Sequence, residues 1–252
     1  MHMDFNQGFR LDGQTALVTG AATGIGFSVA ELFAAQGAQV VLLDRSPDVV
    51  AAAARLPGKQ LGLVCDVARQ SDIDQAVSQA IEQFSGIDIL VNNAGVALLD
   101  MAFDVRESDW DTTLAINLKA AFFLSRAVAR GMRERGSGRI VNLASQASVI
   151  ALERHVAYCA SKAALVSMTQ VLAVEWAPYG ITVNAVSPTV VETALGKKAW
   201  AGEVGESMKK KIPVGRFAQP DEVAAAILYL VSGHSRIVTG ANLLIDGGYT
   251  VQ

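Results

Sequence analysis

The segment TALVTGAATGIG at residues 15–26 determines how the rest of the chain is interpreted. Its first residues, Thr15–Thr19, form a short β-type run, and the next seven residues contain three glycines. Phe27–Gln36 then carries apolar residues at helical spacing, and Gly37 stands where a helix would end. A strand, a glycine-rich turn and a helix in this order predict the opening unit of a parallel α/β sheet.

The rest of the chain continues the same alternation of strand-like and helical segments. The further apolar runs, which do not alternate with polar residues, are Val40–Leu43, Gly62–Cys65, Ile87–Val91, Ile140–Leu143, Ile181–Val186 and Leu243–Ile245. Strands that are buried on both faces have this composition. With 252 residues, the chain is long enough for one α/β domain. We therefore expect a single domain over residues 1–252, a doubly wound parallel sheet of Rossmann type with helices on both faces.

Several helices can be placed between these runs. Ser71 with Asp74 has the spacing of a capping box, which predicts a helix that ends near Phe84. Two long helices are expected at Glu107–Glu134 and Val156–Ala177, and another begins at Pro220. Residues 189–213 break the alternation directly after a strand end. Ligands bind at such ends, so this segment is predicted to be a lid over the site rather than an ordinary surface insertion.

Composition and charge exclude several classes of protein. Hydrophobic residues make up 51% and charged residues 18%, which excludes a disordered chain. The mean hydropathy of +0.32 is high, but no 18-residue window lacks a charge or a helix breaker, so no membrane span is expected. The excess apolar surface is better explained by a doubly covered sheet and an oligomer interface. We expect the two long helices to carry a second apolar face that pairs with another copy of the chain.

The remaining composition limits partners and compartment. The net charge is −3 and no basic block occurs, which disfavours nucleic acid and anionic membranes as partners. Cys65 and Cys159 show no metal-ligand spacing, so neither a disulfide framework nor a metal site is expected. No signal peptide pattern precedes the first strand, so the expected compartment is the cytoplasm.

The glycine turn predicts a dinucleotide site. Gly20, Gly24 and Gly26 are spaced as GxxxGxG, and they would let backbone N–H groups approach a pyrophosphate. Asp44 ends the second strand, 18 residues past Gly26, where a carboxylate accepts hydrogen bonds from a ribose diol. That charge would repel a 2′-phosphate and favours NAD over NADP, although the neighbouring Arg45 could serve such a phosphate.

Polar residues also follow the later strands. Asp66 ends the third strand, and the sequence Asn92-Asn93-Ala94-Gly95 ends the fourth. The carboxyl ends of parallel strands lie at one edge of the sheet, where a dinucleotide would bind. Taken singly, each of these residues could equally be a turn former.

A second group of residues suggests proton transfer. Tyr158 and Lys162 lie one turn apart on a helical face, where an ammonium and a positively charged nicotinamide would lower the phenol pKa. Ser145 follows a strand end and could hold a substrate oxygen. Asn117 is awkward inside a helix, so it could kink the backbone and hold a water that relays protons from Lys162. Taken singly, each of these residues could instead be an ordinary solvated side chain without a functional role.

Taken together, these motifs resemble the short-chain dehydrogenase/reductase family. The resemblance rests on TGaatGIG (Thr19–Gly26), NNAG (Asn92–Gly95), Asn117, Ser145 and YCASK (Tyr158–Lys162), and it extends from Leu11 to Gly248. It implies that Tyr158 is the acid/base, Lys162 its activator, Ser145 the substrate orienter and Asn117 the fourth member of a catalytic tetrad. The cofactor contacts that we expect are Gly20, Thr23, Gly24, Ile25, Gly26, Asp44, Arg45, Asp66, Val67, Asn93, Ala94, Gly95, Tyr158, Lys162, Pro188, Val191 and Thr193.

One departure from the family pattern concerns the sixth strand. Members usually have Pro-Gly there, but this chain has Pro188-Thr189, which puts the contacts on the nicotinamide side in doubt. A narrower resemblance, to bacterial polyol dehydrogenases of the threitol, galactitol and glycerol type, rests on PTVVETALGKKAW (Pro188–Trp200) and IDGGYTVQ (Ile245–Gln252). It suggests a polyol/ketose substrate, and the candidate substrate contacts are Ser145, Gln146, His155 and Tyr158.

Other functions fit parts of the pattern. An NADPH-dependent 3-oxoacyl-carrier-protein reductase shares the framework, but Asp44 argues against it. A non-catalytic dinucleotide sensor would not need Asn117, Ser145, Tyr158 and Lys162 together. A methyltransferase would leave the tyrosine–lysine pair unexplained. The sequence therefore favours an NAD-dependent oxidoreductase that interconverts a secondary alcohol and a ketone.

Overall fold

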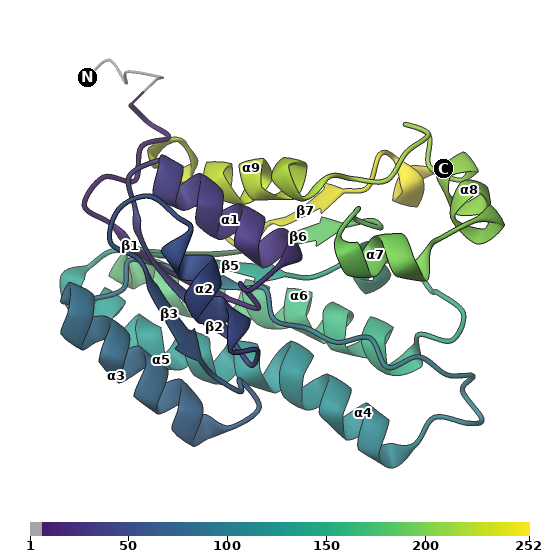
Figure 1. Ribbon diagram of the computed structural model, residues 1–252, viewed down its shortest axis with the longest axis horizontal. Helices are drawn as coiled ribbons and strands as arrows, with labels where there is room; N and C mark the ends of the chain where they lie inside the picture. The colour runs from purple at the N-terminus through teal and green to yellow at the C-terminus, as the bar shows by residue number, and fades with distance from the viewer. Residues whose placement is uncertain (1–6) are drawn as a thin grey trace.

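A parallel sheet forms the centre of the protein (Figure 1). The computed structural model describes residues 7–252, except for the side chains of residues 195, 198 and 199. Within this range the sheet has seven strands in the order β3-β2-β1-β4-β5-β6-β7, and every pairing is parallel. The strands are β1 (Thr15–Thr19), β2 (Gln39–Asp44), β3 (Leu61–Val64), β4 (Ile89–Asn92), β5 (Gly138–Leu143), β6 (Ile181–Pro188) and β7 (Asn242–Ile245).

Helices cover both faces of the sheet, as Figure 1 shows. Helix α1 packs against α9 above the sheet, and α3 packs against α5 below it. The helices are α1 (Gly24–Ala35), α2 (Asp48–Ala54), α3 (Gln70–Phe84), α4 (Glu107–Leu114), α5 (Ala120–Arg135), α6 (Val156–Trp176), α7 (Ala194–Ala199), α8 (Glu203–Lys210) and α9 (Pro220–Val231). The predicted doubly wound fold is confirmed.

The strand order determines where a ligand can bind. The chain winds outward from β1 to β3 and then returns to form β4 on the other side of β1. The crossovers therefore leave the carboxyl ends of β1 and β4 in opposite directions, which opens a crevice between them. The residues after β1, β2, β4, β5 and β6 all lie along this edge.

The sheet separates two large apolar clusters. Phe33, Leu42 and Ile227 are fully buried in the cluster between the sheet and helices α1 and α9. Leu90 and Met132 are fully buried in the cluster on the opposite face. With both faces covered, the strands carry apolar side chains in both directions. This accounts for the uninterrupted apolar runs in the sequence.

Two helix starts differ from the sequence prediction. Helix α1 begins at Gly24, earlier than expected, because the glycine turn itself forms the first helical turn. The predicted capping box at Ser71 and Asp74 is wrong, because α3 begins at Gln70 and Ser71 lies inside it. The carboxylate of Asp72 accepts the backbone N–H of Asp66 at 3.3 Å instead, which links the helix start to the end of β3.

The long helix expected at Glu107–Glu134 contains an irregular turn. A π-helical segment, Ala115–Lys119, joins α4 to α5 without a break. Asn117 lies in this segment and is only 1% exposed, so the predicted distortion at this residue is confirmed. A π turn inserts an extra residue into the helix and often marks a functional site.

The segment at residues 189–213 has structure of its own. It contains α7 and α8, which lie at the carboxyl-terminal edge of the sheet near the end of the chain (Figure 1). Met208, Ile212 and Phe217 form a small buried cluster against Val190 and Trp200. The segment is therefore packed on its own core beside the strand ends. Its role as a lid stays a prediction.

Helix α6 is the most apolar long helix in the described part of the chain. The stretch Val156–Tyr179 is long and apolar enough to cross a membrane by length and composition alone, a test that core helices also pass. In the fold, α6 packs against β6, with Leu165 and Leu172 buried. Part of its apolarity therefore serves the core of this protein, while several of its valines are exposed.

Candidate active site

The glycine turn after β1 is closed tightly on itself. A Cβ atom on Gly26 would lie 2.3 Å from the carbonyl oxygen of Gly20, and Gly20 has a φ of +64°. The Asn93 amide nitrogen donates to the carbonyls of Thr19 at 2.8 Å and Gly20 at 3.0 Å. Asn93, a predicted cofactor contact, thus fixes the turn against the end of β4. Side chains on these glycines would collide with backbone, so the cradle exists only with glycine.

Asp44 is held in place by backbone donors. Its carboxylate accepts the N–H of Ala22 at 3.1 Å and the N–H of Ser46 at 2.9 Å. The first of these bonds ties the end of β2 to the glycine turn. Asp44 is half-buried and Arg45 is exposed, so a negative charge lies beside the turn where the sequence predicted it.

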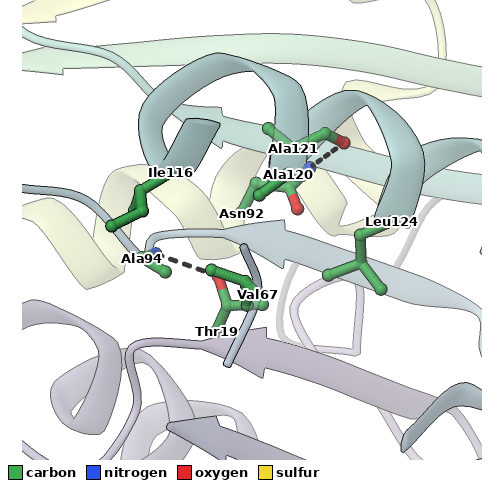
Figure 2. A pocket seen from close by; sticks show the side chains of 8 residues that line it. All are labelled: Thr19, Val67, Asn92, Ala94, Ile116, Ala120, Ala121 and Leu124. Atoms are coloured by element: carbon green, nitrogen blue, oxygen red, sulfur yellow. Dashed lines mark hydrogen bonds between the residues drawn. The ribbon is translucent and has the colours of Figure 1, made fainter. Parts of the chain in front are cut away.

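A small cavity lies between β1, β4 and the π turn (Figure 2). Its volume is about 10 Å³, and it is lined by Thr19, Val67, Asn92, Ala94, Ile116, Ala120, Ala121 and Leu124. The Thr19 hydroxyl accepts the N–H of Ala94 at 2.9 Å, which Figure 2 draws as a dashed line. Val67 and Ala94 were predicted from the sequence, whereas Ile116 was missed. Its position beside Asn117 in the π turn was the available signal.

The segment at residues 189–213 begins against the glycine turn. The Thr193 methyl group would lie 3.2 Å from a Cβ atom on Gly24, and its hydroxyl accepts the N–H of Gly196 at 3.0 Å. Pro188 ends β6, and Val191 forms a bridge with Ala218. Thr193 is therefore brought to the turn from a distant part of the sequence. Asp66 lies further out, half-buried, with its carboxylate accepting the N–H of Ala68 at 3.0 Å.

Lys162 and Asn117 converge on Gly95. The Lys162 ammonium donates to the carbonyl of Leu143 at 2.6 Å. The Asn117 carboxamide accepts from the N–H of Val96 at 2.8 Å and donates to its carbonyl at 2.9 Å. A Cβ atom on Gly95 would lie 3.3 Å from Asn117 Oδ1 and 3.6 Å from Lys162 Nζ. The three residues therefore form one compact group, as the sequence predicted.

Tyr158 lies next to this group on α6. The centre of its ring is 5.6 Å from Lys162 Nζ, and its hydroxyl shares a hydrogen bond with the Ser145 side chain. Ser145 is 9% exposed, and its hydroxyl also accepts the N–H of Ala147 at 3.2 Å. The predicted tetrad of Asn117, Ser145, Tyr158 and Lys162 is thus assembled in one place from three separate elements.

The two remaining candidate substrate contacts flank the tetrad. The His155 ring lies 6.0 Å from the Tyr158 ring, edge to face, with Nδ1 2.6 Å from the carbonyl of Glu153. Gln146 is 3% exposed, and its Oε1 has no hydrogen-bond partner within the described chain. A buried carbonyl oxygen without a donor is unfavourable unless a ligand supplies one.

Burial is the main influence on the pKa values of Lys162 and Tyr158. Desolvation lowers the pKa of Lys162 to about 8. Burial raises the pKa of Tyr158 above its usual value, and the hydrogen bond from Ser145 offsets only part of that rise. The sequence predicted a lowered phenol pKa with both Lys162 and a positively charged nicotinamide beside it, whereas burial among the protein's own residues alone raises this pKa. The physical reason is that Lys162 Nζ bonds to Leu143 while the phenol is buried.

The donors and shapes present fit a dinucleotide. The glycine turn offers backbone N–H groups at the start of α1, Asp44 offers a ribose acceptor, and Val67 and Ile116 offer an apolar wall. Among residues 7–252, no group of three or more His, Cys, Asp or Glu side chains could hold a metal ion. A dinucleotide cradle beside a buried tyrosine–lysine pair defines an oxidoreductase that uses a nicotinamide dinucleotide.

Comparisons with known proteins agree with this class. A family model described as enoyl-(acyl carrier protein) reductase matches residues 20–250. An NAD-dependent glycerol dehydrogenase of Listeria innocua is 56% identical over 98% of both chains. A D-threitol dehydrogenase of Mycolicibacterium smegmatis is 49% identical over 100% of this chain and 98% of the relative. A galactitol 2-dehydrogenase of Cereibacter sphaeroides is 41% identical over 99% of this chain and 100% of the relative.

Solved structures show the same fold over the whole chain. A short-chain dehydrogenase/reductase from Mycobacterium marinum has a TM-score of 0.92 at 36% identity, covering 98% of this chain and 99% of that one. A putative gluconate 5-dehydrogenase from Beutenbergia cavernae, with bound NADP at low occupancy, has a TM-score of 0.93 at 36% identity, covering 97% and 100%. The chain belongs to the short-chain dehydrogenase/reductase family.

The buried lysine gives a prediction about stability. Lys162→Met removes a positive charge whose burial opposes folding wherever the amine is protonated in the folded protein. Because the folded pKa, about 8, lies below the ordinary value of 10.5, the unfolded chain binds more protons between these values. Wild-type stability should therefore rise with pH across this window. At neutral pH the variant should be more stable by an amount on the order of 3 kcal/mol, less the lost hydrogen bond.

Urea unfolding without cofactor, at about pH 7 and about pH 9.5, measures this difference. The advantage of Lys162→Met should shrink by more than half at the higher pH. The exposed Lys59→Met serves as the control and should show no such change. A variant that is less stable than the wild type by the same amount at both pH values would contradict the assignment.

Proposed function

We propose that the protein oxidises a secondary hydroxyl of a small polyol to the corresponding ketose, with NAD as the cofactor and Tyr158 as the acid/base. The observation that carries the proposal is the burial of Lys162 beside Tyr158. Burying an ammonium is costly, and beside Tyr158 the charge would offset this cost by stabilising the phenolate during the reaction. The polyol substrate is supported by the names of the relatives, which are glycerol, D-threitol and galactitol dehydrogenases.

The cofactor would be held by the residues that form the cradle. The N–H groups of the turn Gly20–Gly26 would face the pyrophosphate, and Asp44 would accept hydrogen bonds from a ribose diol. Val67 and Ile116 would border the adenosine, and Thr193 would contact the nicotinamide side. When bound, the nicotinamide ring supplies the hydride acceptor.

The protein's own residues would carry out the proton transfer. Tyr158, as the phenolate that has lost its own proton to solvent, would take the proton of the substrate hydroxyl, and the positive charge of Lys162 would stabilise that phenolate. Ser145 would orient the substrate oxygen beside Tyr158, while Gln146 and His155 would contact other hydroxyls. Asn117 would fix the position of the end of β4 relative to Lys162. The segment at residues 189–213 would act as the lid.

The first experiment follows NADH formation with a panel of tetritols, pentitols, hexitols and glycerol, each with NAD and with NADP. The buffer is set at about pH 9, because oxidation needs the tyrosine to lose a proton. A clear response to a polyol with NAD is the expected result. NADPH-driven reduction of a 3-oxoacyl thioester, with no polyol oxidised, would instead support the rival 3-oxoacyl-carrier-protein reductase.

The catalytic assignment predicts the effect of Tyr158→Phe. Removing the hydroxyl leaves the ring in place but removes the proton acceptor. Turnover should therefore fall by about 10³-fold or more, while the dissociation constant for NADH changes little. Steady-state kinetics and fluorescence titration with NADH measure the two quantities. Tyr229→Phe, on the distant α9, is the matched control and should retain full activity. Turnover that survives in Tyr158→Phe would refute the assignment.

The cofactor preference depends on Asp44. Asp44→Asn keeps the shape of the side chain but removes the charge that would repel a 2′-phosphate. The ratio of kcat/KM for NAD to that for NADP should fall by about tenfold or more, mainly through better use of NADP. As a control, Asp48→Asn removes a nearby exposed carboxylate and should leave the ratio unchanged. An unchanged ratio in Asp44→Asn would show that the preference arises elsewhere.

We also propose that the protein works as a homotetramer in the cytoplasm, without nucleic-acid or membrane partners. Helix α6 exposes Val156, Val171 and Val174 at 43%, 53% and 76%, although its other face is buried in the core. A second apolar face on a long helix favours pairing with another copy of the chain. A light-scattering mass near that of one chain would contradict the tetramer.

A further inference from the structure

One buried hydroxyl beside the tetrad has no role in the function described above. Thr189 is 7% exposed, and its Oγ1 has no hydrogen-bond partner within the described residues. Its backbone N–H donates to the carbonyl of Ile245 at 3.1 Å, which continues the pairing of β6 with β7. The backbone N–H therefore has a partner within the fold, while the side-chain hydroxyl has none among the described residues.

The direction of the Thr189 side chain follows from the alternation along β6. Val183 and Ala185 pack into the clusters on the α5 and α6 side of the sheet, whereas Val186 packs into the cluster on the α1 and α9 side. Successive side chains on a strand point to opposite faces. Thr189 is the first residue after β6, and its N–H still pairs with β7; from the alternation along β6 we infer that its side chain lies on the face of Val183 and Ala185, which is the face that carries α6.

The contacts of Ser187 show which element this face of β6 packs against near the end of the strand. Its hydroxyl lies 3.4 Å from the Ser148 hydroxyl, in the short 3₁₀ turn Gln146–Ser148 that follows Ser145. Thr189 is the next residue on the same face, one step nearer the carboxyl end. The turn also contains Gln146, whose Oε1 is the other unpartnered buried atom at this edge. Two orphaned polar groups thus lie around the segment that carries Ser145.

We propose that Thr189 is a specificity-determining residue, whose hydroxyl binds a substrate hydroxyl beyond the reacting carbon and its neighbour. This inference rests on the proposed polyol oxidation. A buried hydroxyl without a partner is unfavourable, and a ligand with several hydroxyls satisfies it as donor or acceptor. A polyol carries such groups at every carbon, whereas a simple secondary alcohol or a vicinal diol carries none beyond the reacting carbon and its neighbour.

The test compares substrates that differ in hydroxyl number, with Thr189→Val as the variant. Valine keeps the shape of threonine but lacks the hydroxyl. For the best tetritol or pentitol, kcat/KM should fall by about tenfold or more, whereas for butane-2,3-diol it should change by less than about twofold. Thr189→Ser, which retains the hydroxyl, should keep most of the activity towards the polyol.

Two further measurements separate this role from others. The dissociation constant for NADH should be unchanged in Thr189→Val, because the hydroxyl is assigned to the substrate. The midpoint of urea unfolding without ligand should stay the same or rise, because an unsatisfied polar group has been removed. A structural role for the hydroxyl would instead lower this midpoint.

Several outcomes would overturn the inference. They are an equal loss with the polyol and the diol, a weaker affinity for NADH, and no effect on the polyol. If the wild type oxidises butane-2,3-diol and polyols but Thr189→Val does not discriminate between them, only this inference fails. If the wild type oxidises no polyol at all, the proposed function fails and this inference fails with it.

Discussion

The burial of one positive charge governs this site. Lys162 lies on the interior face of α6, 3% exposed, with the carbonyl of Leu143 as its hydrogen-bond acceptor. Such burial opposes folding, and no carboxylate is bonded to it among the described residues to offset the cost. The buried charge is explained if it stabilises an anion that forms only during the reaction. The phenolate of Tyr158 is such an anion, and it is the nearest ionisable group on the same helix face.

The rest of the fold holds this charge in position. The glycine turn, the end of β4 and the π turn interlock through Asn93, Gly95 and Asn117, so the cradle for a dinucleotide and the proton-transfer group share one framework. The Asn117 carboxamide also donates to the Ser161 hydroxyl at 3.1 Å, which joins the π turn to α6. A substitution in the cradle would therefore disturb the tyrosine–lysine pair as well. Rigid coupling of this kind is what orients reacting groups for hydride and proton transfer.

Local patterns in the sequence predicted the strands and the glycine turn, because each depends on spacing along the chain, whereas the roles of the tetrad residues came from the family resemblance. The local patterns failed where several arrangements fit the same local pattern or where the outcome depends on burial. At the start of α3, Asp72 rather than Asp74 carries the observed bond, accepting the N–H of Asp66. Ile116 lines the cavity only because the π turn rotates it there. The direction of the Tyr158 pKa depends on burial, which no spacing rule contains, and the orphaned Thr189 hydroxyl appears only when all its neighbours are placed.

The central claim is that the pair of Tyr158 and Lys162 becomes an effective proton acceptor when NAD is bound. The most direct measurement is the pKa of the Tyr158 phenol, from the ultraviolet absorbance of phenolate in the wild type minus that in Tyr158→Phe. The titration is made with and without saturating NAD. Without NAD, the pKa should lie above the ordinary tyrosine value, as burial requires. With NAD it should fall clearly below that value, because a positively charged ring adds to Lys162. The same pKa in both titrations would contradict the account.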